Sequence, residues 1–141
     1  MFIPQEISGG IKVRLQKLLQ AAIKMDDADK GTLQFFNKKL NGLEIVTSEG
    51  FGDDFLAHFK LVTAFDSSCC GRALGVGSPI MINDVTTDAS FKPNLKIAEA
   101  AGFRAVKSVP LFYTDGQRLG VLSTHYKNPK FTWIPKKAIN Y

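Results

Sequence analysis

The chain has 141 residues, of which 45% are hydrophobic and 22% are charged, and its formal net charge is +5. This length fits one domain with its own core, and the composition is that of soluble globular proteins, which argues against a disordered or fibrous chain. No apolar run approaches the roughly 18 residues of a membrane span, and the N-terminus lacks a signal peptide, so we expect a cytoplasmic protein without membrane insertion. The basic residues are scattered along the chain, which argues against a nucleic-acid partner.

The first predicted element is a helix of about four turns, with Ser8 as its N-cap. Its apolar residues recur three or four positions apart, and the positions between them are mostly basic or polar, which is the pattern of a helix with one apolar face. We expect that face to lie on a core or on a partner. It consists of Ile11, Leu15, Leu18, Leu19, Ala22 and Ile23.

A β-hairpin follows this helix. Residues 32–36 and 43–47 are rich in β-forming side chains, and the Asn-Gly pair between them is a hairpin signal. Because side chains alternate between the faces of a strand, we expect the hairpin to have one apolar face. We place Leu33, Phe35, Leu43 and Ile45 on it.

Two further helices are predicted in the middle of the chain. Asp53 and Asp54 put negative charge at the start of the first, which carries Phe55, Leu56, Phe59 and Val62. The segment SSCCGRALGVG forms the second, with Ser67 or Ser68 as its N-cap and Gly75 or Gly77 at its end.

The last third of the chain predicts three strands and one helix. PIMIN is a short strand, DVTTDASFKP is a polar turn, and residues 95–101 form a helix that Gly102 ends. The alternating runs AVKSVPLFY and RLGVLSTHY form a hairpin around an Asp-Gly pair, and Pro110 indicates a bulge or an edge position in the first of them. Hairpins at both ends of the chain predict an α+β protein with an antiparallel sheet.

The two cysteines of the chain are adjacent, at Cys69 and Cys70. A disulfide between neighbours would be strained, because their Cα atoms are only about 3.8 Å apart. We favour a packing role for at least one of them. A helix N-terminus and the nearby Arg72 would both stabilise a thiolate, so a reactive cysteine is the alternative. His58 and His125 lack the spacing of metal ligands, so we expect no metal, and no residues have the pattern of a catalytic triad.

Several segments resemble a GAF domain, in particular the kind found in bacterial sensor histidine kinases. They are DKGTLQFFNKKLNGLEIVTSEGF, SSCCGRAL, PIMINDVTTDASFKP and AGFRAVKSVPLFYTDGQRLGVLSTHY. The resemblance implies a GAF (PAS-like) fold, with a central antiparallel sheet of about five or six strands and helices on both faces. It also implies a single domain over residues 1–128, with 129–141 as a tail or the start of a linker toward an output domain.

The resemblance further implies a function. Domains of this kind are sensory or regulatory modules that bind a small molecule and dimerise, and we expect no catalysis from the domain itself. The family dimerises through its terminal helices, which implies a homodimer through Ile11, Leu15, Leu18, Leu19 and Ile23. Positions that resemble the walls of the family's ligand pocket are Phe55, Phe59, Cys70, Ile82, Phe91 and Phe103, with Ser108 and His125 as polar groups.

Other members of the family imply alternatives. Phytochrome-like GAF domains attach a bilin through a cysteine beside a histidine, whereas Gly71 follows Cys70 here, so we expect no covalent bilin. Free methionine-R-sulfoxide reductases resemble the chain around CCG and INDV but carry a further cysteine where it reads TTDASFKPN. Thiol-dependent reduction of that kind is the enzymatic alternative, and a ligand-free interaction module is the third.

Overall fold

The structure, a computed structural model, describes residues 9–131. Its strands are β1 (Lys30–Asn37), β2 (Gly42–Glu49), β3 (Ile80–Ile82), β4 (Ala105–Phe112) and β5 (Arg118–Tyr126). Its helices are α1 (Gly9–Met25), α2 (Asp53–His58), α3 (Cys69–Val76) and α4 (Leu95–Ala101), and the 3-10 turn η2 (Ala89–Asn94) precedes α4. Ser8 and the expected tail beyond 131 lie outside the described residues.

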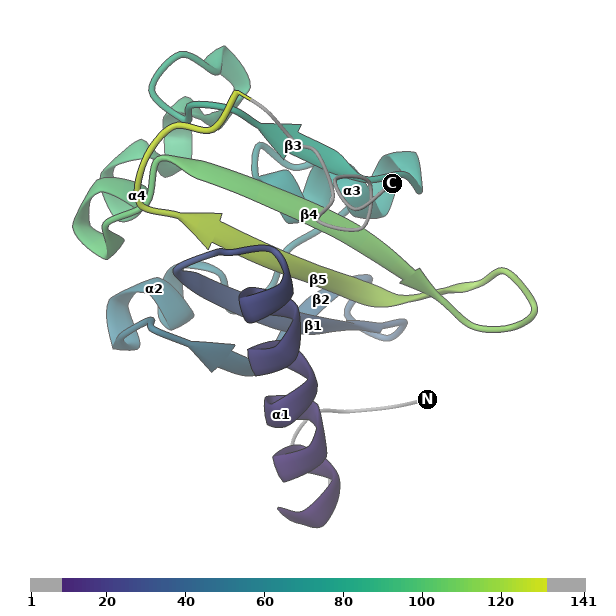
Figure 1. The fold of residues 1–141 in the computed structure, drawn as a ribbon. Helices are drawn as coiled ribbons and strands as arrows, with labels where there is room; N and C mark the ends of the chain where they lie inside the picture. Colours follow the sequence, from purple (N-terminus) through teal and green to yellow (C-terminus); the bar gives the residue numbers. More distant parts are fainter. Residues whose placement is uncertain (1–8, 132–141) are drawn as a thin grey trace, which may run out of the picture.

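The five strands form one antiparallel sheet in the order β2-β1-β5-β4-β3. Helix α1 lies on one face of the sheet, and α2, α3 and α4 lie on the other side (Figure 1). The expected α+β architecture, with an antiparallel sheet of about five or six strands and helices on both faces, is therefore confirmed with five strands. Within residues 9–131, no helix has both the length and the apolarity to cross a bilayer.

Each face of the sheet has its own apolar core. The larger core lies under α2, α3 and α4, and the smaller one includes Leu33, Phe35 and Val46 beside α1. Leu15 packs against this smaller core, and Leu19 is completely buried. The two cores place β1 and β5 between α1 and the layer of α2, α3 and α4.

The expected dimer surface of α1 is partly used within the chain. Leu15 and Leu19 face the sheet, and Ile23 lies against Gly31 of β1. Ile11 and Leu18 remain 45% and 54% exposed. A homodimer through the first helix stays a prediction, and only these two of its five expected residues are exposed.

The expected apolar face of the first hairpin is wrong. Phe36 is opposite Leu43 and Gln34 is opposite Ile45, so Leu43 and Ile45 face the larger core, away from Leu33 and Phe35. The register shifts between Leu33 and Gln34, where β2 carries one extra residue. Leu43 and Ile45 pair on the turn side of this shift, so their face is set by the turn, which pairs Asn37 with Gly42. A register that differs by one residue turns a strand's side chains to the other face, which is why the sequence alternation misplaced this pair.

Most predicted ends of elements agree with the structure. Ser68 caps α3, Gly77 ends it in the left-handed conformation, and Gly102 ends α4 in the same way. Pro110 lies beyond the part of β4 that pairs with β3, so its missing N–H faces an open edge, as expected. Val62 lies outside α2, which ends at His58, and forms a bridge with Leu43 instead.

Candidate functional site

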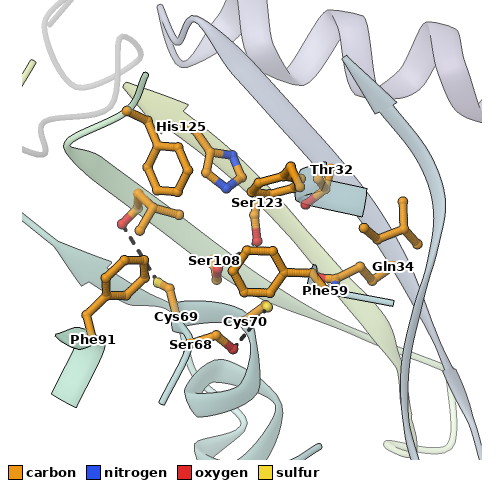
Figure 2. A pocket seen from close by; sticks show the side chains of 14 residues that line it. Thr32, Gln34, Phe59, Ser68, Cys69, Cys70, Phe91, Ser108, Ser123 and His125 are labelled. Atoms are coloured by element: carbon orange, nitrogen blue, oxygen red, sulfur yellow. Dashed lines mark hydrogen bonds between the residues drawn. The ribbon is translucent and has the colours of Figure 1, made fainter. Parts of the chain in front are cut away.

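A small cavity lies between the sheet and the layer of α2, α3 and η2 (Figure 2). Its volume is about 20 Å³, which is room for one water molecule. Its residues come from β1, β2, β4, β5, from the start of α3 and from the segments around α2, η2 and α4. They are Thr32, Gln34, Ile45, Phe55, Phe59, Ser68, Cys69, Cys70, Phe91, Phe103, Val106, Ser108, Ser123 and His125.

The sheet side of this cavity is polar although it is buried. We call the five side chains that form it the polar floor: Thr32, Gln34, Ser108, Ser123 and His125, all of them buried. Thr32 pairs with Ser123, Ser123 pairs with Ser108, and the hydroxyl oxygens of the two serines are 2.6 Å apart. Burying polar groups is unfavourable unless they find partners, so such a cluster on three neighbouring strands is not expected of a core that only packs.

Two atoms of the polar floor have no partner. Among the described residues, Gln34 Oε1 and His125 Nδ1 are buried side-chain atoms without a hydrogen bond. Gln34 is 2% exposed and His125 is 5% exposed, so bulk water does not reach them. An unsatisfied buried acceptor costs about 1–3 kcal/mol, which a bound ligand or water would recover.

His125 is an uncharged histidine at neutral pH. Burial lowers its pKa to about 3, and a hydrogen bond to the Lys30 backbone opposes this only in part. The rings of Phe51, Phe55 and Phe103 surround the imidazole, with centroids 4.8, 5.9 and 4.7 Å away. A neutral imidazole that donates through one nitrogen accepts at the other, so Nδ1 is a free acceptor.

The start of α3 forms the opposite wall of the cavity. Ser68 Oγ accepts a hydrogen bond from Gly71 N at 3.0 Å, and Asp66 Oδ1 accepts from Ser68 N at 2.7 Å and from Ser68 Oγ. Gly71 has no room for a side chain, because a Cβ there would lie 2.2 Å from Asp66 Oδ1. The glycine of the CCG segment therefore allows the carboxylate to hold this helix end in place.

Both cysteines are protonated thiols. Burial raises the pKa of Cys69 to about 12 and that of Cys70 to about 11. The Cys69 thiol donates to the Ile80 carbonyl at 3.4 Å. Cys70 Sγ is 3.3 Å from Ser68 Oγ, and because that hydroxyl gives its proton to Asp66, the thiol is the donor.

Arg72, which we considered as a group that could stabilise a cysteine thiolate, is paired with a carboxylate. Its guanidinium makes two hydrogen bonds to the Asp88 carboxylate, at 3.0 and 3.2 Å. It lowers the pKa of Cys69 only slightly against the effect of burial. The cysteine pair therefore belongs to the packing and hydrogen bonding of the cavity wall.

Seven of the eight residues expected at a pocket line this cavity. Ile82 does not line it. This residue lies on the outermost strand, β3, where it pairs with Val106 of β4 and packs in the larger core. Sequence reasoning missed Thr32, Gln34 and Ser123, whose alternation with apolar neighbours looks like the solvent face of a strand. Within residues 9–131, no group of three or more histidine, cysteine or acidic side chains is placed to hold a metal ion.

Comparisons with known proteins agree with this fold. A family profile described as GAF domain matches residues 11–134. No curated protein sequence matches the chain. Among solved structures, NreA from Staphylococcus aureus, mutated in its nitrate binding site, is 19% identical with a TM-score of 0.70, and 94% of each chain is covered.

Two other solved structures have different functions. A domain assigned to a two-component sensor histidine kinase of Sinorhizobium meliloti 1021 is 15% identical with a TM-score of 0.64, covering 85% of this chain and 76% of that one. Free methionine-R-sulfoxide reductase from Neisseria meningitidis is 16% identical with a TM-score of 0.67, and the match covers 86% of this chain and 65% of the reductase. At these identities the likeness establishes the fold alone.

Proposed function

The chain belongs to the GAF domain family, and from this premise we propose that it is a regulatory domain that binds a small molecule in the cavity above the polar floor. One observation carries the proposal: five buried polar side chains meet on three central strands, and two of their atoms lack partners. Pockets with apolar walls and a few convergent polar groups are the usual form of small-molecule sites. The rings of Phe55, Phe59, Phe91 and Phe103 supply such walls.

The layout of β1 offers a route from the cavity to α1. Thr32 and Gln34 face the cavity, while Leu33 and Phe35 lie in the smaller core beside α1. Because the cavity has room for only one water-sized molecule, a larger ligand must move its walls or its floor. Such a movement would reach α1 through the alternate side chains of the same strand.

We extend this to a finer proposal, that the domain regulates a bacterial signalling protein of the two-component histidine kinase class. The likeness to the Sinorhizobium domain supports it at the level of fold. The proposal requires that ligand change the rate of phosphate incorporation by the kinase that carries this domain. An unchanged rate at saturating ligand would contradict it.

A screen of small molecules by thermal shift tests the main proposal. A ligand at one hundred times its Kd should stabilise the folded chain by about 2.7 kcal/mol, which is a rise of several degrees in Tm. The rise should be strongly reduced in Gln34→Met and retained in the matched control Gln20→Met, whose glutamine is exposed on α1. Hits that stabilise Gln34→Met as much as the wild type would argue against a site in the cavity.

A thiol-dependent reductase is the second candidate, because both cysteines line the cavity and two reductases share the fold. A nucleophilic cysteine must be a thiolate, and the raised pKa values of Cys69 and Cys70 oppose that form. Both are free thiols that hydrogen bond to different partners. We therefore propose that the domain does not catalyse this reduction.

Alkylation by iodoacetamide distinguishes the two candidates. At pH 7.5 we expect both cysteines of the folded chain to react at least about two orders of magnitude more slowly than a free cysteine, because little thiolate is present. Mass spectrometry over time measures the rate, and the chain unfolded in urea provides the control. A folded-state rate at or above that of the unfolded chain would favour the reductase.

A further inference from the structure

The two unpartnered atoms lie toward opposite ends of the polar floor. In the β1–β5 ladder Lys30 is opposite His125, and Gln34 lies four residues further along β1. At about 3.4 Å per residue, this separates the two backbones by roughly 14 Å along the strands. Both side chains line the same small cavity, so the two acceptors lie closer together than their backbones. Thr32 and Ser123, which are paired with each other, lie between them (Figure 2).

Both atoms are acceptors. Burial raises the pKa of Cys70, and a hydrogen bond with the Gln34 side chain opposes this in part. Only a donor stabilises a thiolate, so this bond comes from the amide nitrogen. This leaves Gln34 Oε1 as the unpartnered atom of that amide. At the other end, the neutral ring of His125 presents the lone pair of Nδ1.

The surroundings of the cavity oppose a negative charge. No lysine or arginine is among the residues that line it. Arg72 on α3 is paired with Asp88, and the carboxylate of Asp66 stands at the start of α3, where an anion would otherwise be attracted. The charge of Lys30 acts on His125 from outside the lining, and its ammonium group is bonded to the Ala101 carbonyl, so an anion here would give up its hydration without a charged partner in the cavity.

We propose that the ligand of this cavity is a small neutral molecule that carries N–H or O–H donors toward its two ends, one for Gln34 Oε1 and one for His125 Nδ1. This inference rests on the proposed function, since it names the chemical class that the same site takes. A neutral ligand would distinguish this chain from NreA, which has a nitrate binding site. Nitrate carries no donor and is an anion, so it matches neither the free acceptors nor the charge.

Two isomers of equal atom count test the proposal. 1,4-Butanediol has a hydroxyl donor at each end, whereas 1,2-dimethoxyethane has oxygen acceptors only, and sodium nitrate serves as the anion. Each is titrated into the full chain labelled with ¹⁵N, and the amide and imidazole resonances are followed. We expect 1,4-butanediol to bind at least about tenfold more tightly than either other probe, since only it can form the two missing hydrogen bonds.

The imidazole signal adds a readout that packing alone would not change. The Nδ1 resonance of His125 should move as it accepts a hydrogen bond from 1,4-butanediol and should stay in place with 1,2-dimethoxyethane. In Gln34→Met the preference between the isomers should fall by several fold. The variant removes the unpartnered acceptor together with the amide N–H that bonds to Cys70, so urea unfolding is used to check that it stays folded.

The outcomes separate the two claims. Equal or tighter binding of 1,2-dimethoxyethane or nitrate at the cavity amides would overturn the ligand class and leave the proposed function in place. If none of the three probes changes the resonances of cavity residues at the highest concentration at which the chain stays folded, the ligand class fails, and the thermal-shift screen decides the proposed function.

Discussion

The Gly71→Ala variant is expected to lose about 3 kcal/mol of unfolding free energy, a loss that the neighbouring Gly75→Ala variant on the same helix does not share. A Cβ at position 71 would lie 2.2 Å from Asp66 Oδ1 and 2.7 Å from the Thr63 carbonyl oxygen. Neither atom can move without breaking the contacts that hold the start of α3, so overpacking adds to the loss of the Ser68 cap.

Gly75 provides the matched control for this effect. A Cβ there would lie 2.6 Å from the ring of Phe65, but that side chain is 69% exposed and can turn away. Alanine also favours a helix over glycine by about 1 kcal/mol, which offsets the remaining crowding. Urea unfolding followed by circular dichroism measures both variants. Equal losses in the two would show that Asp66 does not fix the start of α3.

His125 should make the domain sensitive to mild acid. In the unfolded chain the imidazole takes up a proton near pH 6.5, whereas in the folded protein its pKa is about 3. The unfolded state therefore binds more protons between these values, and the unfolding free energy falls as the pH falls. Between pH 7.5 and pH 5 we expect a loss of about 2 kcal/mol from this residue.

The pH range isolates the histidine from the acidic groups. Hydrogen bonds from Gln20 lower the pKa of Glu49, and hydrogen bonds from Arg104 lower that of Asp84. Carboxyl groups of this kind lose their stabilising effect below their ordinary pKa values near 4, so a comparison above pH 5 avoids them. The measurement is urea unfolding at each pH.

Two variants provide the controls for this pH dependence. His125→Phe keeps an aromatic ring in the wall and should be nearly insensitive to pH in this range. His58→Phe, which replaces the exposed histidine of α2, should retain the full dependence. A wild-type stability that stays constant from pH 7.5 to pH 5 would show that His125 is not held uncharged.

Local signals in the sequence predicted the helices and hairpins well. Ser68 and Gly77 at the ends of α3 and Gly102 after α4 act through the conformation of one residue and its nearest hydrogen bonds, so the sequence alone reveals them. Pro110 is informative for the same reason, because its missing donor must face an unpaired edge.

The register and the polar floor depend on distant contacts and could not be predicted. The turn pairs Asn37 with Gly42, and this register puts Leu43 and Ile45 on the face opposite to Leu33 and Phe35, which the alternation of side chains alone does not reveal. Thr32 and Gln34 alternate with Leu33 and Phe35 as solvent-facing residues would. They are buried only because α2 and α3, which come later in the chain, cover that face.

Most residues that we expected at the pocket do lie together around one cavity, whereas the expected hairpin faces were wrong. The resemblance placed residues by their segment and not by periodicity, and seven of the eight line the cavity. Ile82 is the exception because β3 lies at the edge of the sheet, one strand beyond Val106. Their role as ligand contacts stays a prediction.

The central claim is that the cavity above the polar floor binds a neutral ligand through Gln34 Oε1 and His125 Nδ1. A high-resolution crystal structure of the chain with 1,4-butanediol tests it most directly. The account predicts the diol inside the cavity, with its hydroxyl oxygens at hydrogen-bond distance from these two atoms. A cavity that holds only a water molecule, with the diol elsewhere or absent, would contradict it.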